Sequence, residues 1–259
     1  MTKADILNRF NVTEADLCKR VAPQGHEIVF LSGSLFDGLG NARSDLDIFL
    51  VTDDRHPLLQ NERTIDQNVI INNRRFDLSI FSHSLVDETA AVLMGLDFTS
   101  PDIYVPRQLH PQVSNYEICT MVHRLKIGMA IHNHEAFEQL LKQFPFSSYV
   151  HWLIRLRMNE YDGLYEDIVG SLESQDFLTA GELIQQQLHL LAQLLVLSAG
   201  QTFDRDKWVL RKLSQAVSED LFRDFLENKK AVAGGDKSEI LKAIQFCERQ
   251  IEALQLGLL

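Results

Sequence analysis

Two aspartates separated by one residue stand at the start of an apolar segment and are the first candidates for chemistry. They are Asp45 and Asp47, in the stretch SDLDIFLV. Alternate side chains of a strand share a face, so the two carboxylates would point one way while Leu46 and Ile48 point into the core. Mg²⁺ takes oxygen ligands, usually one or two carboxylates together with substrate phosphates. The pair therefore predicts a magnesium site.

A third carboxylate, Asp77, lies in a second apolar segment, RRFDLSIF. Phe76, Leu78 and Ile80 would face the core, which places Asp77 on the opposite face together with Arg75 and Ser79. If this strand lies beside the Asp45–Asp47 strand, three carboxylates converge, the minimum set for two Mg²⁺ ions about 3.5–4 Å apart. The alternative for Asp77 is a salt bridge to Arg74 or Arg75.

A Gly-Ser pair precedes the aspartates and suits phosphate. Gly33 and Ser34 follow an apolar segment and precede a short helical turn. Glycine lets a phosphate approach the backbone, and the serine hydroxyl and following N–H groups can donate to its oxygens. No GK[ST] follows, so this is not a Walker loop, and GxGxxG is absent. Arg43 and Ser44 are further phosphate-contact candidates, with simple loop polarity as the equal alternative.

The elements that must position these residues fall into two regions. The sequence predicts strands at 26–32, 45–52 and 68–82, the last as one strand or as two with a turn at Asn72-Asn73, and helices at 13–22 and 84–95. From about residue 116 helical patterns dominate, at 117–133, 147–172, 175–199, 206–217, 219–229 and 237–256. We expect the α+β class, with a small mixed-sheet catalytic domain at 1–115 and a helical, substrate-binding bundle at 116–259.

Several polar residues of the helical part have two interpretations. One stripe on the 147–172 helix either lines an acceptor cleft or faces water, and we favour water; it comprises His151, Arg155, Asn159, Asp162 and Glu166. Three histidines lack a companion ligand pattern and are predicted to be surface or packed residues rather than metal ligands; they are His123, His132 and His134.

The order Gly33-Ser34, Gly38, Ser44-Asp45-Leu46-Asp47 and then Asp77 resembles the signature of the DNA polymerase β-type nucleotidyltransferase superfamily. The two-domain layout resembles the small-molecule branch, the aminoglycoside and lincosamide antibiotic nucleotidyltransferases. The specific resemblance covers residues 26–82. The segment DRDKWVLRKL also resembles a Lys-Trp helix of this superfamily, which makes Lys207 a candidate triphosphate contact.

The resemblance implies a reaction. A nucleoside triphosphate, expected to be ATP, would lie on Gly33-Ser34 and share two Mg²⁺ ions with Asp45 and Asp47. Asp77 would bind metal on the acceptor side and take the proton of a small-molecule hydroxyl, which attacks the α-phosphate as pyrophosphate leaves. Two alternatives stay open: transfer to a protein side chain or an RNA end, and a catalytically silent nucleotide-binding module on the same fold.

Composition limits the partners. The 259 residues carry a net charge of −11, which disfavours long nucleic acid because backbone binding needs a basic surface. Three distant cysteines and an N-terminus without an apolar signal segment predict a reduced, cytoplasmic protein. No apolar run reaches membrane-spanning length; the longest, 188–199, is interrupted by Gln193 and predicts a buried helix. No feature predicts an oligomeric state.

Overall fold

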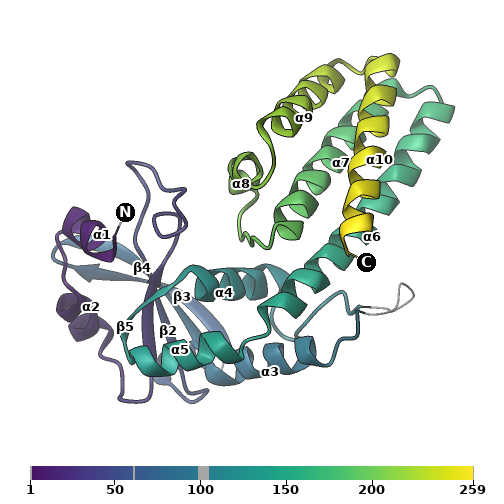
Figure 1. The fold of residues 1–259 in the computed structure, drawn as a ribbon. Helices are drawn as coiled ribbons and strands as arrows, with labels where there is room; N and C mark the ends of the chain where they lie inside the picture. The colour runs from purple at the N-terminus through teal and green to yellow at the C-terminus, as the bar shows by residue number, and fades with distance from the viewer. Residues whose placement is uncertain (1, 61, 99–104, 259) are drawn as a thin grey trace. The chain divides into compact units, whose positions relative to one another are not determined.

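The computed structural model describes residues 2–60, 62–98 and 105–258. The chain divides into two compact units, Met1–Ser148 and Tyr149–Leu259. Unit 1 carries a five-stranded mixed sheet with helices, and the described part of unit 2 is helical. The predicted α+β class is therefore confirmed (Figure 1).

In its described residues, unit 1 begins with two helices, continues with four strands and ends with three helices around a fifth strand. In order they are α1 (Lys3–Phe10), α2 (Glu14–Val21), β1 (Ile28–Ser32), β2 (Asp47–Thr52), the 3₁₀ turn η1 (Pro57–Leu59), β3 (Thr64–Ile71), β4 (Arg74–Ser82), α3 (His83–Met94), α4 (Asn115–Ile127), β5 (Met129–His132) and α5 (His134–Gln143).

The sheet has the strand order β3-β4-β2-β1-β5. β2 and β4 run parallel, and the other neighbouring strands pair antiparallel. The predicted segment 68–82 contributes to two strands, joined at the predicted turn: Asn72 and Asn73 have φ of 50° and 61°. Two consecutive residues with positive φ are what a tight hairpin turn requires, and asparagine tolerates them better than most side chains.

The two faces of the sheet carry different cores. On one face Ile48 and Leu50 of β2 and Leu78 and Ile80 of β4 join a buried cluster with apolar residues of α1 and α2. The other face carries a stack of phenylalanines from β1, β2, β4 and α5, namely Phe30, Phe49, Phe81 and Phe137. The alternation predicted for β2 and β4 is thus observed, and every functional candidate on these strands points to the phenylalanine side.

The helix predicted over 117–133 is wrong in its second half. α4 ends at Ile127, and after Gly128 the chain continues as β5, paired with β1. A Cβ on Gly128 would lie 2.6 Å from Cδ2 of Phe30, so the chain passes too close to the sheet for a side chain there. Because α4, β5 and α5 belong with the sheet, unit 1 extends beyond the boundary predicted between residues 115 and 116.

Two further helices of unit 1 were not expected from the sequence. α1 begins with a capping box in which Thr2 and Asp5 bond to each other's backbone N–H groups. α5 follows Asn133, which has a φ of 55°. Both are short amphipathic segments of ten residues or fewer, whose helical pattern is hard to separate from loop sequence.

Unit 2 consists of long helices joined by short turns. In order they are α6 (Phe146–Glu173, beginning at the end of unit 1), α7 (Phe177–Ser198), η2 (Asp206–Trp208), α8 (Val209–Ala216), α9 (Glu219–Ala231), η3 (Val232–Gly234) and α10 (Lys237–Leu258). Of the run 188–199, predicted to be a buried helix, residues 188–198 belong to α7, and Leu188 and residues 191–197 are buried. Among the described residues no helix combines the length and apolar character needed to cross a bilayer.

Candidate functional site

Asp47 and Asp77 are aligned by the sheet. They are register partners in the parallel pairing of β2 with β4, and the next pair along, Ile48 and Leu78, is buried on the α1–α2 face. Neighbouring strands lie about 4.8 Å apart and register partners point to the same face. The two carboxylates therefore leave the sheet side by side on the phenylalanine face, as the sequence predicted for adjacent strands.

Gly33 lies against the carboxylate of Asp47. It follows β1 directly, and Ser32, the last residue of β1, is the register partner of Asp47. Gly33 has a φ of +113°, and a Cβ built on it would lie 2.6 Å from Oδ2 of Asp47 and 3.0 Å from Nη1 of Arg124. Only glycine meets both demands, since it tolerates this φ and has no side chain. The predicted phosphate contact thus adjoins the predicted acidic pair.

The loop from Gly33 to Leu46 is held by its own hydrogen bonds. The carbonyl of Gly33 accepts from the N–H groups of Phe36 and Asp37 at 3.0 and 3.1 Å, which forms a single turn where a short helical turn was expected. The carbonyl of Ser34 accepts from the N–H groups of Leu39 and Gly40 at 2.9 and 2.7 Å. The hydroxyl of Ser34 donates to Oγ of Ser44 at 3.2 Å, and Ser44 Oγ also accepts from the backbone N–H of Asn41 at 2.8 Å. Two predicted phosphate contacts, Ser34 and Ser44, are therefore brought together.

Arg43 and Asp45 lie on the exposed side of the same loop. Both side chains are exposed, and the backbone N–H of Arg43 donates to Oδ1 of Asn41 at 2.8 Å. The sequence predicted that Asp45 belongs to the strand, but β2 begins only at Asp47, so Asp45 belongs to the loop. Leu46, which lies between Asp45 and Asp47, is 1 % exposed and belongs to the core cluster, so it anchors the loop to the core.

Arg124 of α4 is a residue of this site that sequence reasoning missed. Its Nη1 donates to Oδ2 of Asp47 at 3.1 Å, its side chain is 10 % exposed, and its guanidinium lies 5.9 Å from the Phe49 ring centroid. The hydroxyl of Ser32 donates to the Arg124 carbonyl at 3.0 Å, which ties α4 to the end of β1. The available signal was a basic residue within the apolar stretch MVHRLKI of a helix that covers the sheet.

A second polar contact joins α4 to the loop. Nε2 of His123 lies 3.4 Å from Oδ2 of Asp37, and the two side chains are only 3 % and 13 % exposed. His123 is therefore a packed histidine, in agreement with its sequence interpretation. Together with Arg124 it fixes α4 over the loop that follows β1.

Asp77 is more exposed than its register partner Asp47. Its side chain is 54 % exposed, and Nη2 of Arg75 lies 3.8 Å from its Oδ1. The salt bridge between Asp77 and Arg75 that was considered from the sequence is therefore present, but at long distance. Such pairs between exposed groups contribute little to the stability of the fold.

The three aspartates do not form a closed metal cage by themselves. In the part of the chain that the structure describes, no group of three or more Asp, Glu, His or Cys side chains is arranged to hold a metal ion. Asp47 is turned toward Arg124 and Asp77 lies near Arg75, so the predicted convergence of all three is not seen. The donors still fit Mg²⁺ in kind, because this ion needs only one or two carboxylates when phosphates and water complete its shell.

Lys207, the remaining candidate, belongs to unit 2. It lies in η2, and its Nζ is 5.0 Å from the centroid of the Trp208 ring. The Lys-Trp pair noted in the sequence is therefore an actual cation–π contact.

The comparisons with known proteins concern the fold. No known protein family profile and no curated protein sequence match the chain. Among solved structures the chain is similar to the nucleotidyltransferase-like protein from Exiguobacterium sibiricum 255-15, with 14 % identity, a TM-score of 0.53, and coverage of 93 % of this chain and 74 % of that one. The chain thus has a nucleotidyltransferase-like fold. Because one fold can support many functions, an activity has to be argued from the residues of the site.

Proposed function

We propose that the protein is a nucleotidyltransferase of the small-molecule branch. It transfers a nucleoside monophosphate, with ATP as the expected donor, to a hydroxyl of a small acceptor and releases pyrophosphate. The observation that carries the proposal is the alignment of Asp47 with Asp77, with Gly33 against the Asp47 carboxylate.

Some residues of the site are proposed to bind phosphate and others to bind the metal ion. The backbone of Gly33 and the hydroxyls of Ser34 and Ser44 would hold phosphate oxygens, since Gly33 lies against Asp47 and the hydroxyl of the next residue, Ser34, contacts that of Ser44. Asp47, with Asp45 and Asp77, would hold Mg²⁺. The ion, when bound with the triphosphate, neutralises phosphate charge and makes the acceptor hydroxyl more acidic.

The proposed chemistry is one displacement. A bond forms between the acceptor oxygen and the α-phosphorus, and the bond from that phosphorus to the bridging oxygen breaks, so the electron pair leaves with pyrophosphate. Asp77 is the proposed proton acceptor, because its side chain is exposed and on the same face as Asp47. Arg43 is a proposed triphosphate contact, and its substitution to alanine should raise the KM for the triphosphate.

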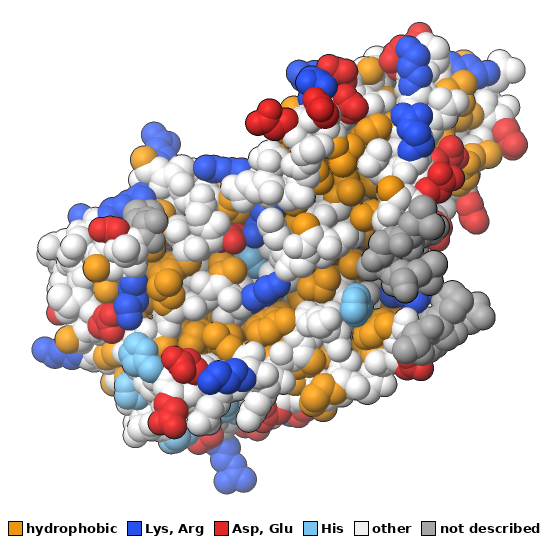
Figure 2. All heavy atoms as spheres, in the orientation of Figure 1, with side chains coloured by type: hydrophobic (Ala, Val, Ile, Leu, Met, Phe, Trp, Pro, Cys, Tyr) orange, Lys and Arg blue, Asp and Glu red, His pale blue; other side chains and the backbone are white. Residues whose placement is uncertain are grey.

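The surface supports a small acceptor over a nucleic acid. Figure 2 shows acidic and basic side chains interspersed on the visible face, and the chain carries a net charge of −11. A backbone-binding groove would instead concentrate Lys and Arg. Three free cysteines fit a reducing compartment, and we propose the cytoplasm.

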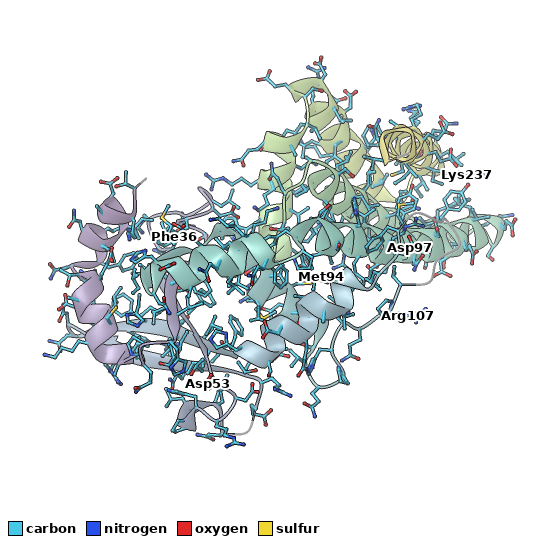
Figure 3. The ribbon with its side chains drawn as sticks, turned by 60° about the horizontal axis from the view of Figure 1, so that its bottom comes forward. Phe36, Asp53, Met94, Asp97, Arg107 and Lys237 are labelled. Carbon is cyan, nitrogen blue, oxygen red and sulfur yellow. The ribbon has the colours of Figure 1, made fainter. Side chains whose placement is uncertain are left out.

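The test compares pyrophosphate release by wild type, Asp47→Asn and Asp53→Asn, using each triphosphate with Mg²⁺ and a mixture of hydroxyl compounds. Asp53 follows β2 at the end of the sheet opposite to Phe36 of the loop after β1, as Figure 3 shows, and pairs with His26, so it is a matched distant control. We expect loss of activity of about a hundredfold or more only in Asp47→Asn. Equal release by Asp47→Asn and wild type would contradict the proposal. The mass added to the acceptor distinguishes a small molecule from a protein or RNA end.

A second candidate is a nucleotide-binding module without turnover. It is favoured by one observation, the ion pair that already engages Asp47 with Arg124. Calorimetric titration with ATP and Mg²⁺, with pyrophosphate followed in parallel, separates the two. Binding without release in the presence of the acceptor mixture would select the silent module.

A further inference from the structure

The position proposed for phosphate at Gly33 lies against two opposite charges. A Cβ built on Gly33 would lie 2.6 Å from Oδ2 of Asp47 and 3.0 Å from Nη1 of Arg124, so the Gly33 backbone adjoins both groups. The two groups pair with each other at 3.1 Å. A phosphate that approaches the Gly33 backbone therefore meets a carboxylate and a guanidinium together.

The carboxylate by itself would repel the phosphate. Water screens this repulsion only in part, because the side chains of Arg124 and Asp47 are 10 % and 23 % exposed. Arg124 supplies the opposite charge at the same place, and the planar fork of N–H donors of a guanidinium matches the oxygens of a phosphate. Arg124 thus has two alternative partners beside Gly33, the Asp47 carboxylate and a bound phosphate.

Contacts other than the ion pair also hold Arg124 in place. The hydroxyl of Ser32 donates to the Arg124 carbonyl at 3.0 Å, which ties its backbone to the end of β1. The guanidinium carbon lies 5.9 Å from the centroid of the Phe49 ring, within the range of a cation–π contact. These contacts keep the arginine beside Gly33 when Asp47 takes another partner.

We propose that Arg124 binds the phosphates of the triphosphate, and that its ion pair with Asp47 is the competing state that the triphosphate must break. The inference rests on the proposed function, because it takes the triphosphate to lie on Gly33-Ser34. Once Arg124 turns to phosphate, the Asp47 carboxylate is available to Mg²⁺. A single exchange of partners therefore prepares both side chains for the substrate.

The experiment leaves out the metal, so that the contribution of Arg124 is measured by itself. The full chain is titrated calorimetrically with ATP in the presence of EDTA, as wild type, Asp47→Asn, Arg124→Met and the double variant. Asp47→Asn removes the competing charge and should bind ATP about tenfold more tightly than wild type, roughly the contribution of one charge-assisted hydrogen bond. The double variant should lose this gain. An equal gain without Arg124 would overturn the proposal, because it would come from the loss of negative charge alone.

Two controls remove one charge of each sign away from the site. Asp53→Asn changes a residue that pairs with His26, and Arg20→Met changes an exposed residue of α2, which packs on the opposite face of the sheet. Each should change the affinity for ATP by less than about twofold, because exposed distant charges are screened. Effects as large as those of Asp47→Asn and Arg124→Met would overturn the proposal.

A conservative variant and a simpler ligand test the contact itself. Arg124→Lys keeps the charge without the planar fork and should recover only part of the affinity lost in Arg124→Met. It also keeps a partner for Asp47, so it remains informative if Arg124→Met folds poorly. Inorganic tripolyphosphate should give the same order of affinities as ATP, and effects confined to ATP would overturn the assignment of Arg124 to phosphate.

Pyrophosphate release distinguishes the failure of this inference from the failure of the proposed function. Affinity for ATP that depends on Arg124, without any pyrophosphate release, would contradict the reaction and support the phosphate contact. Release by wild type, with ATP affinity unchanged in Arg124→Met and Arg124→Lys, would support the reaction and overturn the contact. Absence of ATP binding in every variant would overturn both.

Discussion

Nη1 of Arg124 lies 3.1 Å from Oδ2 of Asp47, and both side chains are mostly removed from solvent. Removing one member of such a pair leaves the other charge without its partner, which costs about 3–5 kcal/mol when burial is complete and less here. We expect Arg124→Met to lower the free energy of unfolding by about 2–3 kcal/mol, measured by urea denaturation.

The double-mutant cycle supplies the control. Asp47→Asn removes the opposite charge, so Arg124→Met should cost clearly less in the Asp47→Asn background than in wild type. Additive effects of the two substitutions would show that the ion pair does not contribute to stability.

Substitutions of Gly33 and Gly38 distinguish the effect of backbone strain from the effect of a close contact. Both have positive φ, +113° and +72°, but a Cβ on Gly38 meets nothing within 4 Å whereas one on Gly33 meets the Asp47 carboxylate. Gly38→Ala should cost about 1 kcal/mol of stability and leave triphosphate binding unchanged. Gly33→Ala should cost more and abolish binding of ATP with Mg²⁺, measured by thermal unfolding and calorimetry. The same affinity in both variants would show that the site does not involve Gly33.

The extent of unit 1 predicts which fragment folds. A fragment of residues 1–148 keeps α4, β5 and α5 and should unfold cooperatively with native near-ultraviolet circular dichroism. A fragment of residues 1–115 loses β5, one of the two strands paired with β1, and the helices α4 and α5 that contact Phe49 and Phe30, so it exposes an apolar face and should aggregate. Cooperative unfolding of the shorter fragment would mean that β5 is dispensable.

The capping box of α2 makes stability depend on pH. Asp16 accepts from the hydroxyl and then the backbone N–H of Thr13, and these bonds lower its pKa. A lowered folded-state pKa stabilises the protein above the unfolded value, about 3.9, and this contribution is lost as pH falls through the folded value. Asp16→Asn should therefore flatten the loss of stability between about pH 5 and pH 2. Identical slopes in urea titrations of the two proteins would contradict this.

Cys247 should be chemically inert in the folded protein. It is fully buried in α10, and burial raises the pKa of its thiol to about 12, so little thiolate forms near neutral pH. Iodoacetamide at pH 8 should modify it only after denaturation. Mass spectrometry of peptides from native and unfolded samples measures this, and modification of Cys247 in native protein would indicate local opening of α10.

The sequence predicted those parts of the site that follow from strand periodicity. Alternation of apolar residues placed Ile48 and Leu78 in the core and so assigned Asp47 and Asp77 to one face, because a strand has a period of two. The turn at Asn72-Asn73 was visible because few other residues tolerate positive φ.

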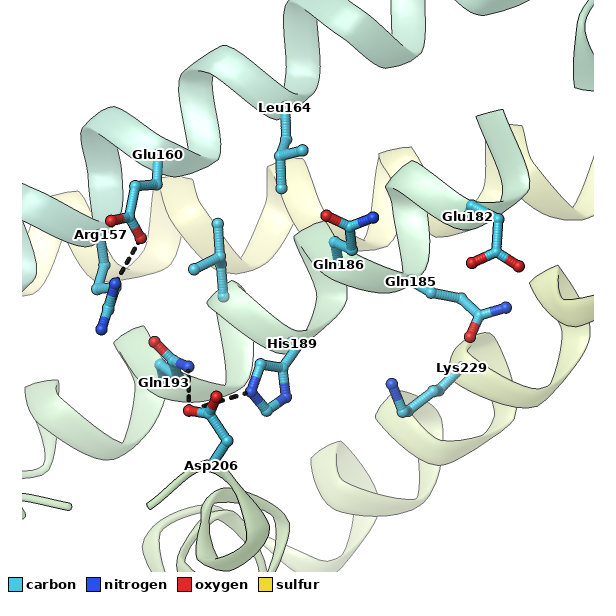
Figure 4. Close-up of a pocket in the computed structure, with 11 residues that line it drawn as sticks. Arg157, Glu160, Leu164, Glu182, Gln185, Gln186, His189, Gln193, Asp206 and Lys229 are labelled. Carbon is cyan, nitrogen blue, oxygen red and sulfur yellow. Dashed lines mark hydrogen bonds and ion pairs between the residues drawn. The ribbon is translucent and has the colours of Figure 1, made fainter. Parts of the chain in front are cut away.

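Other parts depend on tertiary contacts that a single sequence does not encode locally. β5 has four residues and is a strand because β1 offers an edge, so its pattern was absorbed into a helix. Arg124 joined the site through the packing of α4 on the sheet. On α6 the stripe from His151 to Glu166, favoured as solvent-facing, is largely exposed, and a different set, Arg157, Glu160 and Leu164, lines a cavity of unit 2 (Figure 4). Helical period defines stripes, but only packing decides which stripe faces a cavity.

Because β2 and β4 pair in a fixed parallel register, the alignment of Asp47 with Asp77 depends on the packing of the apolar face of the sheet. If β4 slipped by one residue, Asp77 would enter the buried layer next to α1 and α2, and Leu78 and Ile80 would leave it. The burial of Leu78 and Ile80 therefore fixes the position of Asp77 relative to Asp47. The packing of the core and the alignment of Asp47 with Asp77 thus occur in the same step of folding. Under the proposed function, substitutions of Leu78 or Ile80 on the apolar face of β4 should therefore change the rate of nucleotidyl transfer.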